Sequence, residues 1–68
     1  MTTAVEVKNH LELLHTERAL AMTTPLRHDR AYMADLIEEI LATRHAWISS
    51  AVLEIARFRA ELGGAQQG

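Results

Sequence analysis

The chain contains no cysteine, so neither disulfide bonds nor thiolate metal sites can stabilise it. It has one proline and three glycines in 68 residues, which leaves few positions at which a helix must end. Its aromatic residues are Tyr32, Trp47 and Phe58, too few to suggest a surface that stacks on nucleic-acid bases. No apolar stretch approaches the ~20 residues of a membrane-spanning helix, so we expect no membrane segment.

The charge of the chain is also low. A formal net charge of −2 gives no general attraction to nucleic acid or to anionic lipid. The first residues, Met-Thr-Thr-Ala, do not begin a positively charged and hydrophobic signal peptide, so a cytoplasmic location is expected. Apolar residues make up 49% of the chain, which is typical of a globular protein and too much for a disordered one.

The amino-terminal third of the sequence has the pattern of one amphipathic helix. Thr3 and Glu6 have the spacing of a capping box, in which each side chain bonds the backbone of the other. Five residues then recur at steps of three and four and share one helix face: Val7, Leu11, Leu14, Arg18 and Ala21. The segment Thr23-Thr24-Pro25 ends this pattern, since proline cannot continue the hydrogen-bond ladder. The sequence predicts a helix over about 3–22 and a turn at 23–25.

The rest of the chain predicts one long helix. Thr24 can cap it with Pro25 at the first helical position, and Asp29 offers an alternative cap. No further proline or glycine occurs before Gly63-Gly64, which predicts a C-cap. We therefore expect helix two over about 25–62, a single domain over 1–62 and a flexible tail over 63–68. The apolar residues of helix two fall within an arc of roughly 160°: Leu26, Met33, Leu36, Ile37, Ile40, Leu41, Trp47, Ile48, Ala51, Val52, Ile55, Phe58 and Leu62.

The two helices differ in length, and this difference predicts an oligomer. Helix two would be about 57 Å long and helix one about 29 Å, so helix one can cover helix two only to about His45. The apolar residues beyond that point would lack a partner in the chain, and they form the predicted interface: Trp47, Ile48, Ala51, Val52, Ile55, Phe58 and Leu62. The sequence thus predicts an all-α helical hairpin that dimerises about a two-fold axis into a four-helix bundle. The alternative is a break near Ser49-Ser50 and a three-helix bundle.

One pair of residues has the spacing of a metal-binding motif. Glu12 and His15 form an E-x-x-H, which supplies two ligands per helix in di-iron carboxylate bundles. Both lie away from the apolar stripe of helix one, and helix two has no matching motif, so we expect no metal or other cofactor. His10 borders the stripe, and its counterpart on helix two is expected near Glu38, with which a hydrogen bond or an ion pair could form.

Two arginines occupy positions in the apolar stripes. A buried guanidinium without a partner is costly, so each should pair with a carboxylate or reach an edge. An antiparallel hairpin predicts the ion pairs Arg18–Asp29 and Arg44–Glu6, which would fix the register of the two helices.

The remaining polar residues suggest no chemistry. Arg27, His28 and Arg30 form a small basic segment, but Asp29 and the acidic balance of the chain argue against phosphate binding. No nucleophile–base arrangement or glycine-rich loop is present, so we expect no catalytic site. The sequence favours a non-enzymatic interaction, regulatory or adaptor module that self-associates and has an unidentified protein partner. The alternatives are a metal-binding helical bundle and a small nucleic-acid-binding regulator.

Overall fold

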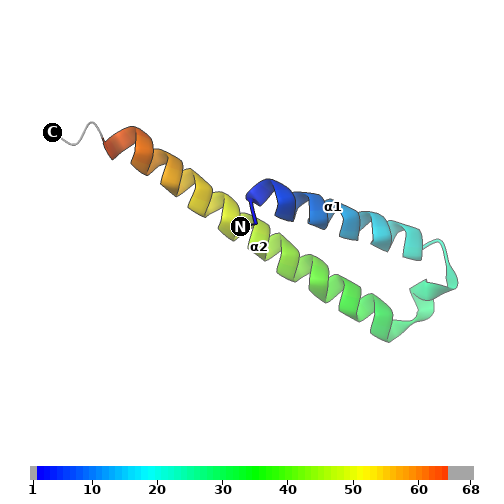
Figure 1. Ribbon diagram of the computed structural model, residues 1–68. Coiled ribbons are helices and arrows are strands. Elements are labelled where there is room, and N and C mark those ends of the chain that lie inside the picture. The colour runs from blue at the N-terminus through cyan, green and yellow to red at the C-terminus, as the bar shows by residue number, and fades with distance from the viewer. Residues whose placement is uncertain (1, 65–68) are drawn as a thin grey trace.

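The computed structural model describes residues 2–64 and has two antiparallel helices joined by a short connection (Figure 1). Helix α1 spans Ala4–Ala21, a 3-10 helix η1 spans Pro25–His28, and helix α2 spans Arg30–Gly64. Within the described residues every regular element is helical. The predicted all-α hairpin with a short first helix and a long second helix is confirmed.

Helix α1 begins and ends where the sequence predicts. Thr3 is its N-cap in extended conformation, and the Thr3 Oγ1 accepts a hydrogen bond from the backbone N–H of Glu6 at 3.2 Å. At the other end Met22 is the C-cap, and the N–H groups of Thr23 and Thr24 donate to the carbonyls of Leu20 and Ala21. These bonds satisfy backbone groups that the end of a helix leaves without an intrahelical partner.

The connection differs from the main prediction and follows the alternative. Thr24 and Pro25 do start a helix, but it is the four-residue η1, in which the Thr24 side chain accepts from the N–H of Leu26. Helix α2 starts only after Asp29, whose Oδ1 accepts from the N–H of Tyr32 at 3.0 Å. The predicted start at Pro25 is therefore wrong. Thr24 and Asp29 are both good N-cap residues, and the chain uses Thr24 to start η1 and Asp29 to start α2.

Helix α2 is continuous through Ser49 and Ser50, so the alternative of a break and a third helix is excluded. It also continues past Leu62 and ends at Gly64, and no glycine of the described part has a positive φ. The predicted C-cap at Gly63 is thus wrong, because that motif requires a left-handed residue. The predicted tail lies, for 65–68, outside the described residues.

A small apolar core lies between the helices. Leu11 and Leu14 of α1 pack with Leu36 and Ile40 of α2. Tyr32 and Trp47 are partly buried against the two ends of this cluster. We call the face of α2 that packs on α1 the inner seam; it consists of Met33, Leu36, Ile40, Thr43, Trp47 and Ser50, all buried or half-buried. Their alternating steps of three and four keep them on one side of the helix.

The hairpin is far from compact because α2 is much longer than α1. Eighteen residues give α1 a length of about 27 Å, and thirty-five give α2 about 52 Å. The molecule measures 63 × 16 × 15 Å, and its radius of gyration is 17.4 Å. A compact chain of this length would have a radius of gyration of about 11 Å. The carboxyl-terminal part of α2 therefore extends well beyond α1 (Figure 1).

Candidate functional site

Helix α1 covers more of α2 than the sequence predicted. The backbone N–H of Ala4 donates a hydrogen bond to Glu54 Oε2 at 2.6 Å, so the start of α1 lies beside Glu54 and not beside His45. The connection through η1 moves the start of α2 to Arg30, which shifts the register of the hairpin. Trp47 consequently packs against the core cluster, and the expectation that it has no partner within the chain is wrong.

Beyond α1, the inner seam changes from apolar to charged. The positions that continue its spacing are Glu54, Arg57 and Glu61, and all three side chains are exposed. A helix face that packs against another apolar surface does not carry charged residues at three successive positions, because burial of unpaired charges is costly. The inner seam is thus completed by α1 alone.

A second apolar face of α2 runs from Ile37 to Leu62, about 100° around the helix axis from the inner seam. We call it the outer stripe; it consists of Ile37, Leu41, Arg44, Ile48, Ala51, Ile55, Phe58 and Leu62. Arg44 is its one polar member. Most of these side chains are exposed, with Ile55 at 55% and Phe58 at 60%. Within the hairpin nothing covers this stripe beyond the reach of α1.

The spacing of the outer stripe is that of a coiled coil. Its members alternate by four and three residues from Ile37 to Leu62, which gives an average repeat of 3.5 over more than three heptads. In such a repeat the a positions are Leu41, Ile48, Ile55 and Leu62, and the d positions are Ile37, Arg44, Ala51 and Phe58. Single exposed apolar residues are ordinary on a protein surface, whereas a continuous exposed stripe of this length is unusual for a monomer.

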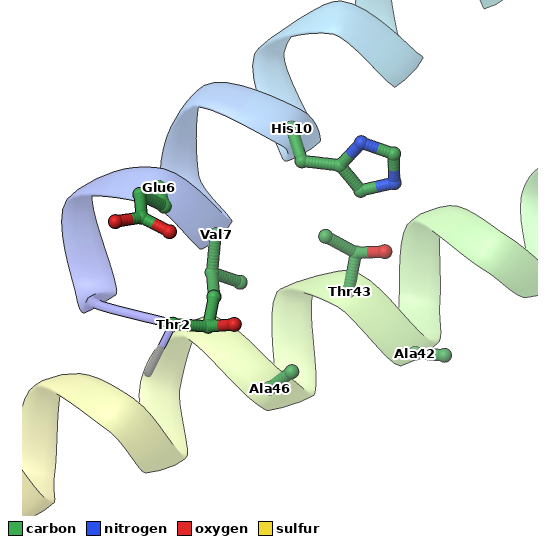
Figure 2. Close-up of a pocket in the computed structure, with 7 residues that line it drawn as sticks. All are labelled: Thr2, Glu6, Val7, His10, Ala42, Thr43 and Ala46. Carbon is green, nitrogen blue, oxygen red and sulfur yellow. The ribbon is translucent and has the colours of Figure 1, made fainter.

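Hollows lie on both sides of the junction of the helices. One of them, about 340 Å³, is lined by Thr2, Glu6, Val7, His10, Ala42, Thr43 and Ala46. Figure 2 shows Val7 and His10 reaching from α1 toward Thr43 and Ala46 on α2. His10 Nε2 lies 3.3 Å from Glu39 Oε2, so the contact expected near Glu38 forms with the next residue, Glu39. Both side chains are about half exposed, which makes this a surface pair of small energetic weight.

The second hollow, about 260 Å³, borders the outer stripe. His15 and Arg18 of α1 line it together with Ile37, Ile40 and Leu41 of α2. It has an apolar floor, since Ile40 is buried in the core, and two basic or titratable side chains on its α1 side. We call it the Arg18 groove.

The two predicted arginine ion pairs are not formed. In the described part of the chain the one ion pair within 4 Å is His10–Glu39. Arg18 and Arg44 are both exposed to solvent, so within the hairpin neither guanidinium requires a carboxylate. Asp29 is engaged as the cap of α2. Glu6 lines the hollow that also contains Ala42 and Ala46, whereas Arg44 belongs to the outer stripe on another side of α2, so the two side chains do not meet.

The predicted metal candidates do not form a site with other ligands. Glu12 and His15 are exposed, and the described residues bring no group of three histidines or carboxylates together for a metal ion.

In the basic segment Arg27 Nε donates to His28 Nε2 at 3.1 Å, within exposed η1. No helix among residues 2–64 is both long enough and apolar enough to cross a membrane.

One polar contact joins the helices at the connection end. The hydroxyl of Tyr32 donates to Glu17 Oε2 at 2.6 Å. This hydrogen bond to the neutral phenol raises the pKa of Tyr32 above its ordinary value of 10.0; desolvation and the negative charge of Glu17 act in the same direction. Sequence reasoning missed the pair because its geometry depends on the connection.

The structural features define a class: a two-helix hairpin with an uncovered coiled-coil face. Comparison with protein-family models, with curated proteins and with solved structures gives no match for this chain.

Proposed function

We propose that this chain is a non-enzymatic protein–protein interaction module, of the regulatory or adaptor kind, that acts as a homodimer. The observation that carries the proposal is the outer stripe, an exposed apolar coiled-coil repeat from Ile37 to Leu62. A further, unidentified protein partner would bind the dimer. The interaction surface is thus the feature that supports this function.

The amount of exposed surface supports association. A compact 7.6 kDa chain exposes about 4,300 Å², whereas this chain exposes 5551 Å². Even if the five residues outside the described part contributed about 750 Å² of this surface, residues 2–64 would still expose about 700 Å² more than a compact chain of their mass. Two chains together would then have roughly 1,400 Å² to bury, which is the size of a standard protein–protein interface.

The energy at stake is large for a small protein. Full burial of one large apolar side chain stabilises by about 1.5–3 kcal/mol. In the single hairpin Ile48 is 49% exposed. More than half of the surface is exposed at Ile55, Phe58 and Leu62. A 68-residue chain is only marginally stable alone, so a second copy that buries these residues would contribute much of the total stability.

The test is a pair of aspartate substitutions on the exposed end of α2. Phe58→Asp places a charge in the outer stripe, and Ala60→Asp places the same charge two residues later, about 200° around the helix axis. Molar mass by light scattering and helicity by circular dichroism are measured for both. We expect Phe58→Asp to reduce the mass to that of one chain and to lower the helicity, because an unpaired buried charge is costly.

Ala60→Asp should retain the mass and helicity of the unmodified protein. If both variants keep the dimer mass, the outer stripe is not the interface. If the unmodified protein has the mass of one chain at all concentrations, the proposed homodimer is wrong.

A further inference from the structure

We propose that two copies dock antiparallel through their outer stripes, so that the exposed end of α2 from each copy fills the Arg18 groove of the other. This inference rests on the proposed homodimer and specifies its orientation and contacts. It makes α1 part of the interface, although α1 contributes no residue to the stripe itself. Four observations carry it: the position of Arg44, the register of the stripe, the groove, and the charges around it.

Arg44 distinguishes between the two possible orientations. In a parallel dimer each d residue faces the same residue of the second copy, so the two Arg44 side chains would meet in one layer and repel each other. In an antiparallel dimer a residues face d residues, and Arg44 lies opposite Ile55 of the second copy. The two arginines are then about 17 Å apart along the helix axis, and each can extend its guanidinium to the edge.

The antiparallel register that pairs Arg44 with Ile55 also pairs every other member of the stripe. Ile48 lies opposite Ala51 near the two-fold axis, and Leu41 lies opposite Phe58. The last layer places Ile37 opposite Leu62. A large side chain thus faces a small one at the centre, which suits close packing of the layers. All eight positions have a partner, and none extends beyond the end of the second helix.

The Arg18 groove lies at the place where this register puts the exposed end of the second α2. Its floor includes Ile37 and Leu41, which are the residues that face Leu62 and Phe58 of the second copy. Because the dimer is two-fold symmetric, this contact between a groove and the end of an α2 helix occurs twice. The hollow of about 260 Å³ is smaller than typical small-molecule pockets, and it suits apolar side chains of an arriving helix.

The charges beside the groove are complementary to those of the arriving helix. Arg18 and His15 lie on the α1 side of the groove. Glu61 occupies the g position next to Leu62, and in this register g residues lie on the side of α2 that carries α1. Arg18 therefore meets Glu61 of the second copy. This contact gives a role to an arginine that stands in the apolar spacing of α1 and has no ion pair within the described hairpin.

A second complementary pair lies on the opposite side of the stripe. Glu38 and Arg59 are both e positions, and antiparallel packing brings e residues of the two copies together. In the same register Glu38 lies opposite Arg59 of the second copy. A parallel dimer would place Glu54 near Arg59, but Glu54 already accepts the N–H of Ala4.

Cysteine cross-linking tests the orientation directly, because the natural chain has no cysteine. Ile37→Cys and Leu62→Cys alter residues that are 42% and 59% exposed in the hairpin, so both variants should fold. Each variant alone, and an equimolar mixture refolded together, is treated with a short bis-maleimide and analysed on a denaturing gel. We expect cross-linked dimer in the mixture only. Like residues would be about 38 Å apart, too far for the reagent.

Each outcome has one meaning. Cross-linking of each variant alone would show a parallel dimer and overturn the antiparallel inference, while the proposed homodimer would stand. A dimer mass with no cross-linking in any sample would likewise overturn the inference, because the copies would associate elsewhere. No cross-linking together with the mass of one chain would contradict the proposed homodimer itself.

A charge exchange tests the groove contact separately. Arg18→Glu and Glu61→Arg should each weaken the dimer about ten-fold, since each removes and reverses two symmetric surface pairs. The double variant should recover most of the affinity of the unmodified protein. Arg57→Glu, a charge reversal on the same exposed end of α2, is the matched control and should have little effect. If the double variant binds no better than the single variants, Arg18 does not meet Glu61.

Discussion

The backbone N–H of Ala4 donates a hydrogen bond to Glu54, a residue fifty positions later in the chain, with an N···Oε2 distance of 2.6 Å. A carboxylate at the amino terminus of a helix satisfies a free N–H and interacts favourably with the helix dipole. The contact also marks the point on α2 at which its cover by α1 ends. From Glu54 onward the inner seam is charged and the outer stripe remains apolar.

We expect Glu54→Gln to loosen the first turn of α1. The amide of glutamine can still accept a hydrogen bond, but the loss of the negative charge at the helix terminus should cost about 0.3–1 kcal/mol. Amide hydrogen exchange of Val7 and Lys8 should become faster. Glu12→Gln makes the same charge change at an exposed position of α1 and should leave that exchange unchanged. Equal exchange rates in the two variants would mean that Glu54 does not hold the helix start.

Neighbouring leucines of α1 should differ sharply in their effect on stability. Leu14 is 5% exposed in the core cluster, and Leu13 is 68% exposed. Leu14→Ala removes buried methyl groups and leaves a cavity, so it should lower the free energy of unfolding by about 2–4 kcal/mol. Leu13→Ala should change it by less than about 0.5 kcal/mol. Thermal melts of both variants at one protein concentration measure the two changes in stability. Similar losses of stability would mean that Leu14 is not the buried residue of the pair.

Much of the hairpin is predictable from local chemistry. Thr3 as a cap, the end of the first helix before Pro25, and the faces of Leu11 and Leu14 all depend on neighbours in the sequence. Such features depend on spacing within one helix, and spacing can be read directly. The exposed apolar residues beyond α1, such as Ile55 and Phe58, were predicted from the unequal lengths of the helices. The exposed residues beside α1, such as Ile37 and Leu41, were not.

The exact register and the contacts between the helices were not fully predictable. The two predicted arginine ion pairs are not formed, whereas the contact of His10 expected near Glu38 forms with Glu39. Thr24 and Asp29 are both good caps, and no local rule decides that the chain forms a 3-10 turn at one before starting α2 at the other. That choice moves α1 along α2. Trp47 therefore joins the core cluster. Arg44 does not pair with Glu6, because Arg44 lies on the outer stripe and Glu6 lies on the other side of the junction of the helices. The Arg18 groove depends on the same register and needed the structure to be found.

The pH dependence of the tyrosine should report the contact between Tyr32 and Glu17. The pKa of Tyr32 is raised because the neutral phenol donates to the Glu17 carboxylate. A spectrophotometric titration should therefore give a midpoint above 10.0. Because the folded-state pKa is the higher one, this contribution to stability is fully present below the unfolded-state value, and it is lost as the pH rises through the folded-state value.

Glu17→Gln provides the comparison for that titration. It removes the negative charge while retaining a hydrogen-bond acceptor, so the tyrosine midpoint should fall toward the ordinary value. A midpoint that is the same in both proteins would show that Glu17 does not control the tyrosine.

The central claim is that the outer stripe is an interface between two copies, and sedimentation equilibrium of the unmodified protein tests it most directly. We expect a molar mass of 15.2 kDa at micromolar concentration, twice the 7.6 kDa of the chain, with dissociation to single chains only on dilution. A mass of 7.6 kDa at every concentration would contradict it, because the exposed stripe from Ile37 to Leu62 would then have no second copy to cover it.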